Sequence, residues 1–271
     1  MQGIKQFIPT ATKATYINQL LKVGFDTIDF GSFVSPRAIP QMRDTAEVLS
    51  RLDLDNTKSK LLAIVANIRG ANDASQFEEI NYLGYPFSIS ENFQMRNTGK
   101  TIAESILILD EILAIATKTN KEVVAYLSMG FGNPYGDPWS VDIVADWTQK
   151  MSSMGVKIIS LSDTIGSSTP TIINYLFSHL IPLYPTIEFG AHLHTTPATW
   201  QEKVSAAYQA GCNRFDSAIK GYGGCPMAKD ELTGNMPTEK VLHYFNEKKV
   251  NLELNQKSFD EAYNNASHVF L

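Results

Sequence analysis

The sequence predicts an α/β protein with a parallel sheet, and three observations lead to that prediction. Short apolar runs alternate along the chain with longer segments whose apolar residues recur at helical spacing. Some of the short runs are apolar almost throughout, as in residues 60–67, which is typical of a strand buried on both faces. The chain has 271 residues, of which 44% are hydrophobic, so it can bury a large core. Strands that alternate with helices favour parallel pairing.

Seven strands are expected, and a helical segment follows each of them. The segment 101–117 is the clearest helix, because Ile102, Ile106 and Leu109 recur at helical spacing with Glu104 on the polar side. The expected strands are residues 25–30, 60–67, 80–87, 122–127, 157–161, 186–194 and 214–219. The expected helices are residues 10–21, 39–52, a short one near 73, 101–117, 141–151, 171–180, 202–210, 239–247 and 259–269.

The number and order of these elements favour a (β/α)8 TIM barrel over an open doubly wound sheet. A doubly wound sheet usually carries a glycine-rich phosphate turn after its first strand, and this sequence has none. The chain opens with a helix and shows seven strands where a barrel has eight. We therefore expect one barrel domain over residues 1–271 that lacks its first strand.

Composition and charge exclude several classes of function. The net charge of −5 and the absence of a basic stripe give no electrostatic basis for binding nucleic acid. Acidic or amide residues interrupt the apolar segments, so no membrane-spanning helix is expected. The two cysteines, Cys212 and Cys225, cannot form a disulfide framework, and no signal peptide follows Met1. These features predict a cytoplasmic protein.

Polar residues stand at the carboxyl ends of all the expected strands. Barrel enzymes gather their chemistry at these ends. A ring of polar residues is therefore a candidate active-site mouth, although each residue alone could cap a turn. The residues are Asp29, Asn67, Ser88 with Glu91, Ser128, Asp163, His192 with His194, and Lys220.

His192 and His194 are two residues apart on a strand, so their side chains project from the same face. Two adjacent imidazoles can fill neighbouring positions around a divalent metal. The alternative is a pair of polar residues that close a strand.

Two later segments add candidate groups. Residues 220–228 contain three glycines before Cys225, so this cysteine could swing over a ligand as an acid or base, or be an incidental thiol in a turn. Asn235 and Glu239 offer an amide oxygen and a carboxylate near a helix start, where a turn or cap role is the alternative.

Five motifs follow one another along the chain. They are Ser32-Phe33-Val34-Ser35-Pro36-Arg37, Ser160-Leu161-Ser162-Asp163-Thr164-Ile165-Gly166, His192-Leu193-His194, Gly223-Gly224-Cys225-Pro226 and Gly234-Asn235-Met236-Pro237-Thr238-Glu239. Together they resemble the motifs of 3-hydroxy-3-methylglutaryl-CoA (HMG-CoA) lyases, part of a metal-dependent barrel superfamily that includes homocitrate and isopropylmalate synthases. The Gly-Gly-Cys-Pro motif is the most specific to the lyases.

The resemblance implies a retro-Claisen cleavage of an acyl-CoA thioester, HMG-CoA, in a homodimer. It implies that His192, His194 and Asn235 are ligands of Mg2+ or Mn2+, with an aspartate from the family's first strand. It implies that Cys225 protonates the acetyl-CoA enolate. The acidic residues of the site are Asp163, Glu239 and Asp29, the last at a position where the family commonly has glutamate. The implied substrate contacts are Ser160, Thr164, Arg96 and Asn97.

The sequence departs from the family pattern in three ways. Thr195 and Ser162 replace a common aspartate and a common glycine, and the family's first strand, which ends in Arg-Asp, has no counterpart here. We therefore expect Met1 to be an internal methionine of a longer chain. Two other functions stay open, namely an acyl-CoA/keto-acid condensing enzyme of the same superfamily and a non-catalytic ligand-binding barrel.

Overall fold

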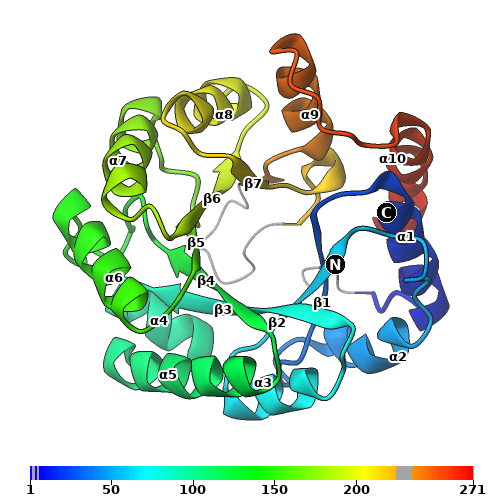
Figure 1. The fold of residues 1–271 in the computed structure, drawn as a ribbon, viewed down its shortest axis with the longest axis horizontal. Coiled ribbons are helices and arrows are strands. Elements are labelled where there is room, and N and C mark those ends of the chain that lie inside the picture. Colours follow the sequence, from blue (N-terminus) through cyan, green and yellow to red (C-terminus); the bar gives the residue numbers. More distant parts are fainter. Residues whose placement is uncertain (2–3, 5, 224–233, 271) are drawn as a thin grey trace.

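Seven parallel strands form one curved sheet in the computed structural model, which describes residues 1, 4, 6–223 and 234–270. The strands pair in chain order from β1 to β7, and a two-residue strand, β8, pairs antiparallel with β6. Figure 1 shows the sheet curling around a centre, with the helices outside it. The strands are β1 (Thr27–Ser32), β2 (Lys60–Ile64), β3 (Ile80–Ser88), β4 (Glu122–Ser128), β5 (Ile158–Asp163), β6 (Glu188–Thr195), β7 (Arg214–Asp216) and β8 (Gly234–Asn235).

The helices that cover the outside of the sheet begin and end where the sequence provides caps. The hydroxyl of Thr101 and the carboxylate of Glu104 form a capping box at the start of α5, and Gly24 ends α1 in a left-handed conformation. The helices are α1 (Thr10–Val23), α2 (Thr45–Leu49), α3 (Ile68–Ser75), α4 (Glu91–Thr98), α5 (Ile102–Lys118), α6 (Val141–Ser153), α7 (Pro170–Leu183), α8 (Trp200–Gln209), α9 (Thr238–Glu247) and α10 (Gln256–Phe270), with 3-10 turns η1 (Pro40–Met42) and η2 (Ile219–Gly221).

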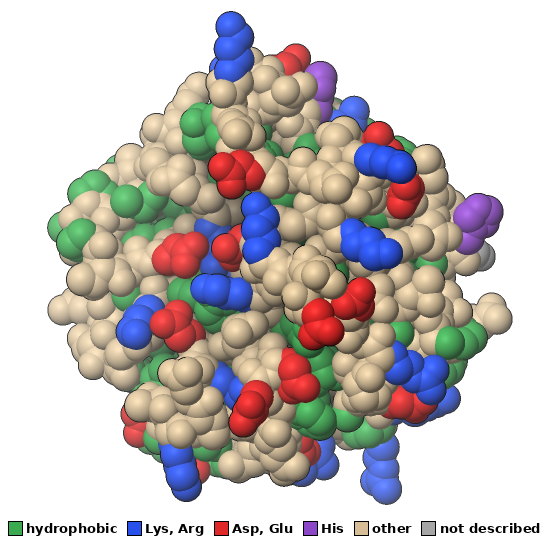
Figure 2. Space-filling model, turned by 45° about the vertical axis from the view of Figure 1, so that its right-hand side comes forward, with side chains coloured by type: hydrophobic (Ala, Val, Ile, Leu, Met, Phe, Trp, Pro, Cys, Tyr) green, Lys and Arg blue, Asp and Glu red, His purple; other side chains and the backbone are tan. Residues whose placement is uncertain are grey.

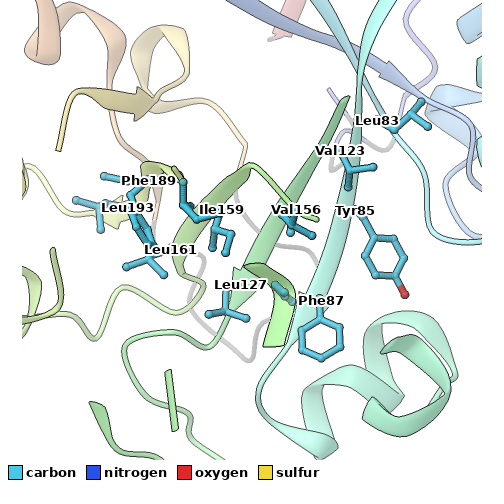
Figure 3. Packing of buried hydrophobic residues seen from close by; sticks show 14 of the residues in the cluster. Leu83, Tyr85, Phe87, Val123, Leu127, Val156, Ile159, Leu161, Phe189 and Leu193 are labelled. Atoms are coloured by element: carbon cyan, nitrogen blue, oxygen red, sulfur yellow. The ribbon is translucent and has the colours of Figure 1, made fainter. Parts of the chain in front are cut away.

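The main hydrophobic core lies between the outer face of the sheet and these helices. Every second side chain of a strand points outward, and on β3 these are Leu83, Tyr85 and Phe87, all buried. Figure 3 shows this outward series together with Leu127 and Leu161 of the next strands. The outer face therefore holds the helices on the sheet and carries most of the buried apolar surface.

The inner face of the sheet has a smaller apolar floor. Leu62, Tyr82, Val124 and Ile158 of four successive strands pack together there. The residues two positions further along β4 and β5 are Tyr126 and Ser160, so the inner face becomes polar towards the carboxyl ends of the strands.

The expected fold is confirmed, since each of the seven expected strands overlaps an observed one. No pairing joins β1 to β7 in the part of the chain that the structure describes, so the barrel is open between them. None of the described helices is long and apolar enough to cross a membrane. Charges of both signs are interspersed on the face drawn in Figure 2.

The observed helices differ from the expected ones in two places. Residues 39–52 form η1 and the short α2, because the Thr45 hydroxyl bonds to the carbonyls of Met42 and Ser32 and ties this segment to β1. Helix α4 was not expected, although its signals are present. The Ser90 hydroxyl accepts a hydrogen bond from the amide of Phe93, and Gly99 ends the helix with a φ of 68°.

Candidate active site

Polar side chains meet on the inner face of the sheet near the carboxyl ends of β4 to β7. Tyr126 lies opposite Ser160 in the register of β4 and β5, and His192 lies opposite Asp216 in the register of β6 and β7. Residues paired across parallel strands share a face, so these four side chains form one group. Gly190 leaves room for them, because a Cβ there would lie 3.0 Å from the Ser160 Oγ atom.

Asp216 joins two members of this group. Its Oδ2 atom lies 3.1 Å from Nδ1 of His192 and accepts a hydrogen bond of 2.9 Å from the Ser160 hydroxyl. Burial acts to raise the pKa of the Asp216 carboxyl. The hydrogen bond and charge of His192, the charge of Arg214 and the Ser160 hydroxyl outweigh it and lower this pKa. Asp216 is therefore an anion that holds His192 by one ring nitrogen and leaves Nε2 for a ligand.

His194 and Asn235 come together because β6 and β8 pair. The two residues are register partners in this antiparallel ladder, and the amide of Met236 donates to the carbonyl of Leu193 at 3.2 Å. The His192 and His194 ring centroids are 5.6 Å apart. The Asn235 amide nitrogen donates to the carbonyl of Tyr222 at 2.8 Å, so its Oδ1 atom points elsewhere.

The residues present fit a divalent cation that keeps open coordination positions. Two imidazoles and one amide oxygen are suitable ligands, and Asp216 behind His192 supplies the carboxylate partner that metal-binding histidines commonly have. The described residues contain no cluster of three or more His, Cys, Asp or Glu side chains that could hold a metal. The three candidate ligands are neutral, and they leave coordination positions for water or substrate oxygens.

Asp29 lies on β1, across the open barrel from β6 and β7. Burial among protein atoms inside the curve of the sheet raises the pKa of its carboxyl to about 7, although its surface is accessible to solvent. The amino group of Met1 and the charge of His192 oppose this rise in the pKa, whereas Asp216 adds to it. The side chain therefore changes charge near neutral pH.

Asp163, by contrast, lies on the outer face of β5. It is three residues from Ser160, and an odd separation along a strand reverses the direction of the side chain. Its carboxylate bonds to the ammonium of Lys203 at 2.7 Å and to the Ser168 hydroxyl at 2.5 Å. The hydroxyl of Thr164 accepts a hydrogen bond of 2.9 Å from the amide of Met129.

The other predicted site residues lie at the rim. The Glu239 carboxylate accepts the amide of Lys220 at 2.9 Å. Arg96 and Asn97 are on α4, where the Arg96 guanidinium lies 4.7 Å from the centre of the Tyr135 ring. Cys225 lies outside the described residues.

The structure thus brings Asp29, Ser160, His192, His194 and Asn235 to the inner face. Two further residues of this group, Asp216 and Tyr126, are not among the predicted site residues. The Tyr126 ring centroid lies 5.4 Å from that of His192. A signal for Asp216 was present, because the alternation in Arg214-Phe215-Asp216 places its first and last residues on the same face.

The chain is also similar to known proteins along most of its length. The HMGL-like family matches residues 1–265. The chain belongs to this family. It is 32% identical to hydroxymethylglutaryl-CoA lyase YngG of Bacillus subtilis over 243 residues, which are 90% of this chain and 80% of the relative. It is 32% identical to the human mitochondrial hydroxymethylglutaryl-CoA lyase over 266 residues, which are 97% of this chain and 80% of the relative.

Solved structures described as HMG-CoA lyases also match along nearly the whole chain. An HMG-CoA lyase from Acinetobacter baumannii, in complex with coenzyme A and 3-methylmalate, superposes with a TM-score of 0.91 at 28% identity and covers 99% of this chain and 87% of its own. The HMG-CoA lyase from Brucella melitensis gives a TM-score of 0.91 at 29% identity, over 99% of this chain and 94% of its own.

Proposed function

We propose that this chain is a carbon–carbon lyase that cleaves HMG-CoA into acetoacetate and acetyl-CoA. The observation that carries the proposal is the meeting of His192, His194 and Asn235 on β6 and β8, in a chain that belongs to the HMGL-like family. Relatives named hydroxymethylglutaryl-CoA lyase, and a structural neighbour that holds coenzyme A, support an acyl-CoA thioester as the substrate.

The reaction requires one proton to leave and one to arrive. A base removes the proton of the C3 hydroxyl, the C2–C3 bond breaks, and a ketone forms at C3 to give acetoacetate. The bonding pair passes to C2 as the enolate of acetyl-CoA, and an acid then protonates C2. The site must therefore supply a base, an acid and a way to stabilise the developing negative charge.

Asp29 is the candidate base. Burial raises the pKa of its carboxyl to about 7 in the metal-free protein, and the raised pKa makes the anion a stronger base than an ordinary aspartate. Cys225 is the candidate acid, an assignment supported by the resemblance of residues 223–226 to the lyase motif. Glu239 and Asp163 act on the site indirectly. The Glu239 carboxylate accepts a hydrogen bond from the backbone amide of Lys220. The Asp163 carboxylate accepts one from the ammonium of Lys203.

His192, His194 and Asn235 are the residues that would hold Mg2+ or Mn2+. When bound, such an ion would polarise the substrate oxygens and favour loss of the hydroxyl proton. Asp216 and Ser160 orient the His192 ring, because both hydrogen bonds end on the same carboxylate oxygen.

Arg96 and Asn97 are candidate contacts for the CoA portion of the substrate. The guanidinium of Arg96 is exposed and stacks on Tyr135, which leaves its N–H groups free to bind phosphate oxygens. Ser160 is fully buried and donates to Asp216, so we assign it an indirect part in substrate binding. Thr164 orders the neighbouring backbone through Met129.

The proposal is tested by incubating the purified chain with HMG-CoA and Mg2+ or Mn2+ and measuring acetoacetate. Formation of acetoacetate that EDTA abolishes, and that either ion restores, would support the proposal. A protein that binds Mn2+ and CoA but yields no acetoacetate from HMG-CoA or a panel of related 3-hydroxyacyl-CoA thioesters would contradict it. Release of CoA from acetyl-CoA and a keto acid would indicate the condensing enzyme instead.

We also propose a homodimer in the cytoplasm, in line with the family resemblance. Light scattering gives the mass in solution, and 30.1 kDa is the mass of one chain. A single species near that mass would contradict the dimer. Fractionation of the source cells would test the compartment, because named relatives include both cytoplasmic and mitochondrial enzymes.

A further inference from the structure

Lys203 is a buried cation to which the proposed chemistry assigns neither a proton transfer nor a substrate contact. It lies on α8, on the helix side of the sheet, and only 3% of its side chain is exposed. The partner carboxylate of Asp163 is completely enclosed. Burial of an ion pair costs free energy unless both charges are hydrogen-bonded. The hydrogen-bond partners of Lys203 therefore indicate the role of the pair.

The ammonium of Lys203 makes three hydrogen bonds, which is all that it can donate. It donates to the Asp163 carboxylate at 2.7 Å, to the carbonyl of Gly166 at 2.9 Å and to the carbonyl of His194 at 2.9 Å. These acceptors belong to the end of β5, to the turn that follows it and to the end of β6. One charge therefore joins three backbone segments at the carboxyl edge of the sheet.

The bond to the His194 carbonyl acts on the residue that carries a candidate metal ligand. His194 and Asn235 are paired at the end of β6, so the orientation of this peptide affects both side chains. The Asp163 carboxylate in turn accepts a hydrogen bond of 3.0 Å from the Ser168 amide.

We propose that Lys203 is a positioning residue for the metal site, and that its bond to the His194 carbonyl sets the direction of the His194 ring. This inference rests on the proposed function for its choice of metal. Lys203 touches neither the substrate nor the ion, and it acts through the backbone of β6. The charge of Asp163 stabilises Lys203 in place.

The test compares two buried ion pairs of the same kind. Lys13 and Asp44 are also 2.7 Å apart, with 3% and 9% of their side chains exposed, and Lys13 also donates to a carbonyl, that of Gln41. The double variants Lys203→Met/Asp163→Asn and Lys13→Met/Asp44→Asn each remove both charges, so neither leaves an unpaired ion in the interior.

Mn2+ binding to the metal-free protein is measured by electron paramagnetic resonance, together with the melting temperature. We expect Mn2+ affinity to fall about 10–100-fold in the Lys203 double variant, the range seen when residues that orient metal ligands are removed, and to stay unchanged in the Lys13 double variant. A folded Lys203 double variant that binds Mn2+ within twofold of the unaltered protein would overturn the proposal.

A third variant removes the charge of Asp163 and keeps that of Lys203. Asp163→Asn keeps the bonds of Lys203 to the Gly166 and His194 carbonyls, so we expect lower stability with Mn2+ affinity close to that of the unaltered protein. A loss of affinity in this variant equal to that of the double variant would overturn the role of the carbonyl bond. Should the double variant not fold, Lys203→Met/Asp163→Leu, which replaces the whole pair with apolar side chains, is measured in the same way.

A second readout needs no metal. The chain has five histidines, whose ring signals can be followed by 1H–15N correlation spectra of the metal-free protein. We expect the His194 signal to shift or broaden in the Lys203 double variant and to stay in place in the Lys13 double variant. An unmoved His194 signal would contradict positioning by Lys203. Absence of Mn2+ binding in the unaltered protein would instead overturn the proposed metal site.

Discussion

The two faces of the curved sheet differ in chemistry although every strand contributes to both. Outward side chains such as Phe87 and Leu161 are completely buried among apolar neighbours. Inward side chains near the carboxyl ends of the strands, such as Ser160 and His192, are polar and bonded to one another through Asp216. A residue for stability and a residue for chemistry thus stand next to each other on one strand.

Asp163 and Asp216 show the difference in detail. Asp163 faces outward, where a carboxylate is tolerated because Lys203 and Ser168 donate three hydrogen bonds to it. Asp216 faces inward, where it holds a histidine and stays within reach of solvent, with 24% of its side chain exposed. The outer face therefore uses charge to join segments, and the inner face keeps charge available for a ligand.

The largest effect is expected from an outer-face truncation. Phe87→Ala should lower the free energy of unfolding by about 3–5 kcal/mol, because it removes a fully buried ring that packs on Trp147. The turnover of the folded fraction should stay unchanged. Urea denaturation measures the first quantity and acetoacetate formation the second.

The control for this prediction is Leu107→Ala on α5, where 68% of the residue is exposed. This change should leave the free energy of unfolding nearly the same. Equal losses at the two positions would contradict the assignment of the core to the outer face.

Truncation of an inner-face side chain should lower activity strongly and stability only slightly. His192→Ala should lower acetoacetate formation by more than about 100-fold, because removal of a ligand costs more than the 10–100-fold typical of residues that only orient one. The free energy of unfolding of His192→Ala should fall far less than that of Phe87→Ala. His243→Ala, on the exposed side of α9, is the matched control and should retain full activity. A similar loss of acetoacetate formation in both variants would contradict a role for His192 in the reaction.

Period-two alternation explains why so much of this comparison could be read from the sequence. It placed His192 and His194 on one face, and it places Arg214 and Asp216 together as well. The position of Asp163 at the end of a strand predicts a place among the inward polar residues. Its odd separation from Ser160 assigns its side chain to the outer face.

Long-range partners could not be predicted in this way. Lys203 is 40 residues from Asp163, and Asp216 is 56 residues from Ser160. Local spacing contains no information on which helix position meets which strand end. Family resemblance supplied candidate ligands, whereas the groups that orient them required coordinates.

A smaller effect is expected at the carboxylate behind His192. Asp216→Asn still accepts hydrogen bonds but removes the charge that makes the His192 ring a better ligand, so Mn2+ affinity should fall about 10–100-fold. Isothermal titration calorimetry measures this affinity. Asp73→Asn, in an exposed pair with Arg69 on α3, is the control and should bind Mn2+ normally. Unchanged affinity in Asp216→Asn would indicate that the inner face does not depend on this charge.

The smallest effect concerns the proton on Asp29. Because the surroundings raise the pKa of this carboxyl from 3.8 to about 7, the folded protein keeps the proton over a pH range in which the unfolded chain has lost it. The contribution of Asp29 to stability is therefore greatest at low pH and declines as the pH rises towards 7. The ionised form increases over the same range, so in the metal-free protein the ionised fraction of the Asp29 carboxyl, followed by 13C NMR, should rise about tenfold from pH 6 to pH 8. Asp29→Asn should abolish this rise, whereas Asp26→Asn, at an exposed position just before β1, should retain it. A midpoint near the ordinary value of an aspartate would show that the inner face does not alter the acidity of its side chains.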